Sequence, residues 1–145
     1  MKMKMTIAAA MLLATTGLAR ADGPNLIEVR QAGMNLVSAD FAGIRAVIAA
    51  KGDVKTLENP AKAMQRWSAL SPSLFPKGTE TGGNTKAMPE VWSDAAGFAK
   101  AAAGMSEAVG VMMAAAKAGD ADAAAAAVKG IGDSCLNCHK TYRAK

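Results

Sequence analysis

Two cysteines and the chain's single histidine fall within five consecutive residues near the C-terminus. The segment reads Cys135-Leu136-Asn137-Cys138-His139. On a helix, Cys135 and Cys138 lie one turn apart on the same face, so each thiol can add across one vinyl group of a porphyrin and form a thioether. His139 follows at once, and its imidazole can reach the iron from one side as the proximal ligand. C-x-x-C-H with this spacing is the attachment sequence of c-type haem.

Three other chemistries use Cys and His at short spacing, and the rest of the chain disfavours each of them. A disulfide between Cys135 and Cys138 suits an exported protein but closes a very small loop, which constrains the unfolded chain little. A thioredoxin-like redox pair needs a βαβ context, and an alanine-rich chain with 4% aromatic residues does not favour a sheet. A zinc site would find three ligands here and no further Cys or His. The sequence therefore predicts one covalently bound haem c.

Residues 1–21 predict a secretory signal peptide. Lys2 and Lys4 form a positive start, a short apolar stretch follows, and Ala19-Arg20-Ala21 fits an A-x-A cleavage site. The apolar stretch is shorter than the roughly 20 residues of a membrane span. Cleavage after Ala21 leaves residues 22–145 as one domain by length.

The charge of this mature chain excludes a nucleic-acid binder. Loss of Lys2, Lys4 and Arg20 leaves 14 basic and 12 acidic side chains, a formal charge of +2. The sequence predicts that no second apolar stretch is long enough to cross a bilayer. The expectation is a soluble protein exported to the periplasm, with no membrane insertion after cleavage.

The spacing of apolar residues predicts four helices in the mature chain. They are expected at residues 24–50, 53–70, 89–118 and from 120 or 122 to 143. Pro60 either kinks the second helix or follows Asn59 as the cap of a shorter one. Short links make the first and last pairs antiparallel neighbours, and residues 71–88 form one long connection anchored by Leu74 and Phe75. The predicted fold is all-α, an antiparallel four-helix bundle.

The inner face of the first helix contains one charged residue. Arg30 interrupts a stripe that is otherwise apolar: Ile27, Met34, Val37, Phe41, Ile44 and Ile48. The seams are rich in alanine, so side chains leave volume that protein interiors rarely tolerate, and we expect an internal ligand. Gly33 costs about 1 kcal/mol against alanine in a helix, which indicates a close approach of the haem edge or of a partner helix.

Several segments together resemble class II cytochromes c, the cytochrome c′ family with its six-coordinate, methionine-ligated members. The late C-x-x-C-H motif and the four-helix pattern are similar to that family. So are the segments Arg30-Gln31-Ala32-Gly33-Met34, Phe75-Pro76-Lys77-Gly78-Thr79, Pro89-Glu90-Val91-Trp92 and Cys138-His139-Lys140-Thr141-Tyr142-Arg143. The resemblance covers nearly all of the mature chain and implies a bundle that encloses one haem.

The resemblance also implies roles for individual residues. Cys135 and Cys138 would hold the haem and His139 would be the proximal iron ligand. Arg30 matches the first-helix arginine that interacts with a haem propionate, as a buried cation needs a partner; the alternative is a surface ion pair. Arg143 matches an arginine near the proximal imidazole, and a solvated helix end is the alternative.

Met34 decides between two functions. It lies four residues after Arg30 on the same helical face and matches the position over the distal side of the haem. If its thioether binds iron, Met/His ligation suits electron transfer. If it only packs there, the iron is five-coordinate and open to small gases. A third possibility is that Met34 fills a gap without contacting the haem.

The first functional prediction is a one-electron carrier that works with redox partner proteins and is not an enzyme. The alternative is a sensor or scavenger of NO or CO. Peroxidase-like catalysis is disfavoured because the chain has no second histidine for acid–base work. The family resemblance also implies a possible homodimer formed through the first two helices.

Overall fold

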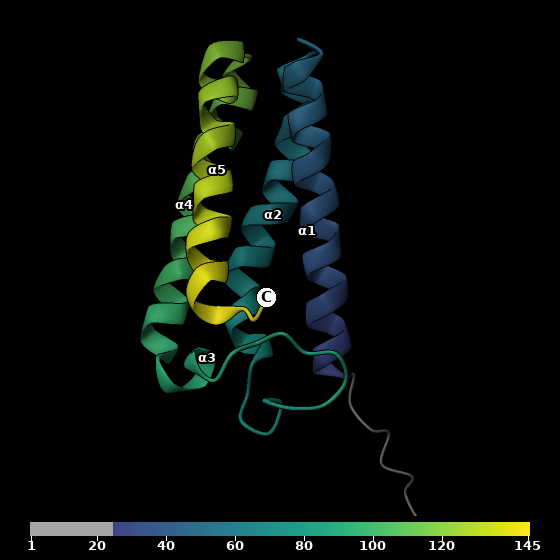
Figure 1. Cartoon of the computed structure of the whole chain (residues 1–145). Helices are drawn as coiled ribbons and strands as arrows, with labels where there is room; N and C mark the ends of the chain where they lie inside the picture. The colour runs from purple at the N-terminus through teal and green to yellow at the C-terminus, as the bar shows by residue number, and fades with distance from the viewer. Residues whose placement is uncertain (1–24) are drawn as a thin grey trace, which may run out of the picture.

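The computed structural model describes residues 25–145, so the predicted signal peptide of residues 1–21 lies outside the described residues. Four long helices run alternately up and down (Figure 1): α1 (Leu26–Ala49), α2 (Glu58–Leu70), α4 (Ala95–Ala118) and α5 (Ala121–Tyr142). Short elements accompany them, namely η1 (Val54–Leu57), η2 (Ser71–Leu74) and α3 (Glu90–Ser93). The predicted antiparallel four-helix bundle is confirmed.

Local residue chemistry explains where the helices begin and end. The side chains of Asn25 and Asp120 accept hydrogen bonds from the backbone of the first turns of α1 and α5. Gly119 ends α4 in the left-handed conformation, with φ of 72°, which glycine adopts without steric cost. The predicted helix ends at Gly119 and Asp120 are confirmed, whereas α1 begins at Leu26 after the Asn25 cap and not at the predicted residue 24.

Two boundaries differ from the prediction. The second helix is not kinked at Pro60: α2 begins at Glu58, Pro60 lies in its first turn, and Asn59 lies inside the helix instead of capping it. The third predicted helix is broken at Asp94, whose backbone leaves the helical region at φ −122° and ψ 54° and whose side chain caps α4 by accepting a hydrogen bond from Gly97.

The two ends of the bundle are built differently. The apolar end is filled by the largest fully buried side chains: Ile44, Leu57, Met64, Val109, Met112 and Ile131. The cavity end contains the N-terminal half of α1 and the C-terminal half of α5, together with the long connection (Figure 1). There an aromatic cluster of Phe75, Trp92, Phe98 and Tyr142 packs edge to face, with ring centroids 4.9–5.9 Å apart.

The long connection, residues 71–88, is held at the cavity end by contacts with the aromatic cluster and with the C-terminus. Phe75 anchors it in the aromatic cluster, as predicted. Near its end it pairs with the C-terminus through an antiparallel bridge between Ala87 and Arg143. The Met88 N–H donates to the Tyr142 carbonyl at 3.0 Å, and the Ala144 N–H donates to the Lys86 carbonyl at 2.8 Å.

Among the described helices, α1 alone is long and apolar enough to cross a membrane, judged by its length and composition. The prediction that no apolar stretch after the signal peptide reaches this length is therefore wrong. The inner face of α1 packs mainly on α2 and carries the buried guanidinium of Arg30. Packing in the bundle accounts for only part of its apolar character, because 17% of the apolar window is buried.

Candidate haem site

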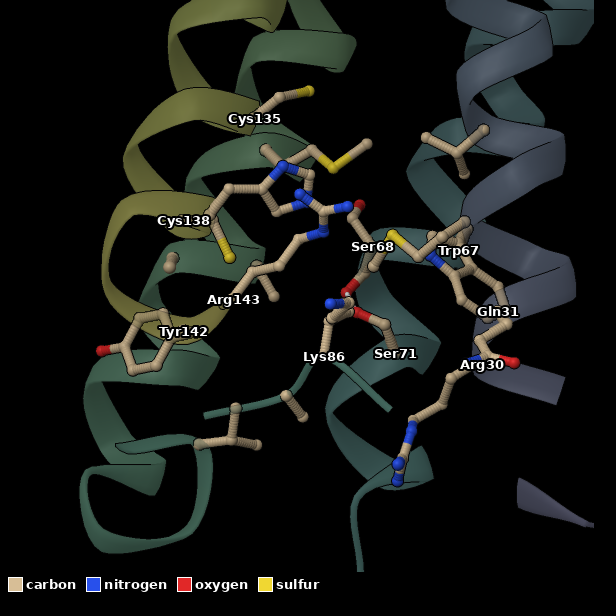
Figure 2. A pocket seen from close by; sticks show the side chains of 18 of the residues that line it. Arg30, Gln31, Trp67, Ser68, Ser71, Lys86, Cys135, Cys138, Tyr142 and Arg143 are labelled. Atoms are coloured by element: carbon tan, nitrogen blue, oxygen red, sulfur yellow. Dashed lines mark hydrogen bonds between the residues drawn. The ribbon is translucent and has the colours of Figure 1, made fainter. Parts of the chain in front are cut away.

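A cavity of about 670 Å³ lies at the cavity end, between α1, α2, α4 and α5 (Figure 2). This volume falls within the roughly 300–1,000 Å³ that small-molecule and cofactor pockets occupy. The structure brings all six predicted site residues to its wall: Arg30, Met34, Cys135, Cys138, His139 and Arg143.

The two cysteines lie on one wall of the cavity. Figure 2 shows Cys135 and Cys138 on α5, across the cavity from Trp67 and Ser68. Both are half-buried and neither forms a disulfide. Burial raises the pKa of both thiols, and the neighbouring Cys135 raises that of Cys138 further. Both sulfurs therefore keep their protons at neutral pH, in the S–H form that adds across a vinyl group.

His139 follows on the same helix and lines the same cavity. Burial lowers the pKa of its imidazole, and the positive charge of Arg143 lowers it further. The ring is thus held neutral, which is the form that binds a metal. Arg143 lies one turn later, and its backbone N–H donates to the His139 carbonyl at 3.2 Å. Its positive charge acts on the imidazole, and the role toward the haem that the resemblance implies for Arg143 stays a prediction.

Arg30 is 4% exposed and therefore forms no surface ion pair. Its guanidinium donates to the Leu74 carbonyl at 3.1 Å, to the Thr79 hydroxyl at 2.8 Å and carbonyl at 3.1 Å, and to the Thr85 hydroxyl at 3.3 Å. It also lies 4.3 Å from the centroid of the Phe75 ring, a cation–π distance. Burial lowers its pKa. Arg30 fastens the long connection to α1 and lines the cavity at the same time.

Met34 lines the cavity from α1, opposite the helix that carries His139. Its side chain is 38% exposed, so it does not contribute a fully buried core contact. The preceding residue, Gly33, is buried because α2 comes very close: a Cβ added there would lie 2.0 Å from the Trp67 ring. Of the two predicted reasons for Gly33, the approach of a partner helix is the correct one.

The charges on the cavity wall have one sign. Arg30, Lys86 and Arg143 line it, and no Asp or Glu does so among the described residues. Three cations without an acidic partner suit a ligand that brings its own carboxylates, because a desolvated charge requires a counter-charge. Haem c carries two such groups, its propionates.

A buried donor on the cavity wall also lacks a partner. The Trp67 indole nitrogen is buried without a hydrogen-bond partner among the described residues. An indole N–H can only donate, and such orphaned groups are rare in folded proteins. The cavity volume, the paired thiols, the neutral imidazole, the uncompensated cations and this orphaned donor all fit haem c.

Sequence reasoning missed two of these features. Lys86 lies in a connection whose path across the cavity depends on Arg30, and a solvated lysine has no distinguishing pattern. Trp67 lies in the apolar pattern of the second predicted helix like an ordinary core residue, and nothing in the sequence indicates that it meets Gly33. Within residues 25–145, no group of three or more His, Cys, Asp or Glu side chains is placed to hold a metal ion.

Comparison with known proteins decides the family. The family model described as cytochrome C′ matches residues 25–143. The chain belongs to the cytochrome c′ family. Members of this family, the class II cytochromes c, carry one covalently bound haem c, and haem c is the cofactor that the cavity of this cytochrome c′ accommodates.

Individual relatives support this assignment over most of their length. Cytochrome c′ of Rubrivivax gelatinosus is 36% identical over 121 residues, covering 82% of this chain and 94% of that protein. Its crystal structure matches with a TM-score of 0.74. A nitric oxide complex of a variant cytochrome c′ from Alcaligenes xylosoxidans matches with a TM-score of 0.74 at 32% identity, covering 83% of this chain and 94% of the other.

Proposed function

We propose that this cytochrome c′ is an exported one-electron carrier in which His139 and Met34 would hold the haem iron. Haem c supplies an iron that changes between the ferric and ferrous states. The observation that carries the proposal is that Met34 and His139 line the same cavity from different helices, α1 and α5. A thioether and an imidazole form the ligand pair that raises the reduction potential.

The other residues would hold the cofactor and exclude water. Cys135 and Cys138 would form the two thioethers, and Arg30 would face a propionate while it keeps the long connection closed over the cavity end. Arg143 would keep the proximal imidazole neutral. The chain contains one histidine, so no second imidazole is available as an acid–base group for peroxide chemistry.

A second function, binding of NO or CO, is supported by a different observation. Nitric oxide complexes are known for variants of the Alcaligenes xylosoxidans cytochrome c′, whose structures match 83% of this chain. Met34 is also partly exposed and its thioether is flexible, so a gas could take its place.

Spin state separates the two functions. We expect the ferric protein to give a low-spin electron paramagnetic resonance spectrum, and Met34→Ala to convert it to high spin. Met105→Ala is the matched control, because Met105 lines the same cavity from α4 and should leave the spectrum low-spin. A high-spin spectrum of the unaltered protein, with rapid CO binding when reduced, would support the gas-binding function instead.

We infer export to the periplasm from the predicted signal peptide of residues 1–21, which lies outside the described structure.

The outer face of α1 suggests a homodimer, because Leu36 is 68% exposed there and α1 packs mainly on α2. Sedimentation velocity of the unaltered protein and of Leu36→Glu tests this: a dimer that becomes a monomer in the variant supports it, and a monomer in both contradicts it.

A further inference from the structure

We propose that the Trp67 indole N–H is a hydrogen-bond donor for a propionate carboxylate of the haem. The inference depends on haem c being the cofactor and is independent of whether Met34 binds the iron.

The position of Trp67 is fixed by close packing. Its ring lies against the bare backbone of Gly33, where an added Cβ would meet three ring atoms at 2.0–2.5 Å. The indole therefore has no freedom to turn toward α1. Figure 2 shows its nitrogen on the side that faces the cavity, and Trp67 is one of the residues that line it.

The protein supplies this donor with no acceptor of its own. Within the described chain, two buried side-chain atoms lack a hydrogen-bond partner, the Trp67 Nε1 and a carboxylate oxygen of Glu90, and only Trp67 lines the cavity. An acceptor must come from the ligand. Haem c is apolar around its ring, and its carboxylates are the strong acceptors that it carries.

The neighbouring hydroxyls of Ser68 on α2 and Ser71 at the start of η2 cannot take over this task. The Ser68 hydroxyl donates to the Gln65 carbonyl at 2.8 Å, and the Ser71 hydroxyl donates to the Ser68 carbonyl at 3.2 Å. Both protons are engaged by the helix itself, so these serines present only acceptor lone pairs to the cavity. Trp67 is the remaining donor on the α2 wall.

The charges around this wall favour an anion. Lys86 lies beside Ser68 and Ser71 in Figure 2, and Arg143, the residue after α5, reaches toward the same region. Arg30 faces the cavity from α1, but its two terminal nitrogens are already engaged by the long connection. These cations attract a carboxylate, while Trp67 supplies a directed bond with fixed geometry.

The experiment compares Trp67→Phe with Trp92→Phe in the haem-loaded protein. Trp92 is the matched control because its indole N–H already donates to the Pro76 carbonyl at 3.3 Å. The measurement is the pH dependence of the reduction potential, which reports the ionisation of the propionates.

Removing a donor from a carboxylate disfavours its ionised form. We expect Trp67→Phe to move the propionate titration to higher pH by about one unit, a tenfold change in the ionisation constant. The titratable and charged groups that line the cavity are Arg30 from α1, Lys86 from the connection, His139 from α5 and Arg143 directly after α5. The residues that line the cavity from α2 and α4 are uncharged. Both variants retain all four groups, so Trp92→Phe should titrate like the unaltered protein.

A second measurement needs no cavity substitution and covers the case in which Trp67→Phe fails to fold. The chain has two tryptophans, so ¹⁵N-labelled indole gives two N–H signals, and Trp92→Phe assigns them. In the reduced, carbon-monoxide-treated protein, which is diamagnetic, the Trp67 signal should shift with the propionate titration while the Trp92 signal stays constant.

Three results would overturn the proposal. One is a Trp67 indole signal that does not move with pH. Another is a folded Trp67→Phe protein with an unaltered propionate titration. The third is a change confined to the CO dissociation rate, which would place the donor near the iron. The spin state of the ferric protein reports separately on Met34, so a failure of either proposal is recognised without the other.

Discussion

The apolar end and the cavity end of this bundle use the same four helices for opposite purposes. At the apolar end, large side chains such as Met112 and Ile131 are fully buried and fill the space between the helices. At the cavity end, the helices present Arg30, serines, a close glycine–tryptophan contact and two thiols around about 670 Å³ of space. The difference indicates that the first end stabilises the polypeptide and the second is shaped by its cofactor.

A substitution at the apolar end should therefore change stability without changing the haem. Met112→Ala removes a fully buried side chain and should lower the free energy of unfolding by about 2–5 kcal/mol. Urea denaturation measures this, and the optical spectrum should be unaltered. Val111→Ala is the control, since that residue is 58% exposed and should change stability by no more than about 0.5 kcal/mol. A spectral change in Met112→Ala would show that the two ends are not separate.

A substitution at the cavity end should change both properties. Gly33→Ala places a methyl group where the Trp67 ring now lies, and overpacking of this kind costs about 1–3 kcal/mol. We also expect its haem spectrum to change, because Met34 is the next residue along α1. In Gly43→Ala, on the same helix, the new methyl group meets nothing within 4 Å, so the variant should gain about 0.5–1 kcal/mol. Equal effects of the two variants would contradict the close approach.

The smallest expected effect on stability concerns the hydrogen bond between Tyr142, at the end of α5, and Asp94, the cap of α4. The Tyr142 hydroxyl donates to Asp94 at 2.8 Å, and this bond raises the pKa of Tyr142 to about 12. A raised pKa means that the folded state holds the proton more tightly than the unfolded state, whose tyrosine titrates near about 10. The stabilisation is present in full below about pH 10 and is lost as the pH rises toward about 12.

The single tyrosine makes this titration readable from one signal. The ¹³Cζ resonance of labelled Tyr142 should titrate near pH 12, and Tyr142→Phe should remove this part of the alkaline loss of stability. A resonance that titrates near pH 10 would show that the bond to Asp94 is absent in solution.

Sequence patterns predicted what depends on local chemistry. The C-x-x-C-H spacing, the caps at Asp120 and Gly119 and the charged position within the α1 stripe were each readable from a few consecutive residues. The break at Asp94 was missed because the apolar spacing continues through it. Its cause is a side chain that caps α4 and accepts the bond from distant Tyr142.

Features that need the third dimension could not be predicted. Arg30 was identified as buried and in need of partners, but those partners lie 44 to 55 residues away in a connection with no periodic pattern. The orphaned donor of Trp67 is likewise visible only once α2 packs on Gly33. Sequence locates the groups that we propose to bind the haem, and packing shows which of them already have partners in the protein.

The most direct test of the central claim is the intact mass of the exported protein, followed by peptide mapping. The account predicts the polypeptide of residues 22–145 plus one haem, with the added mass on the peptide that contains Cys135 and Cys138. A folded, colourless protein with the mass of the polypeptide alone, its two sulfurs free or bonded to each other, would contradict it.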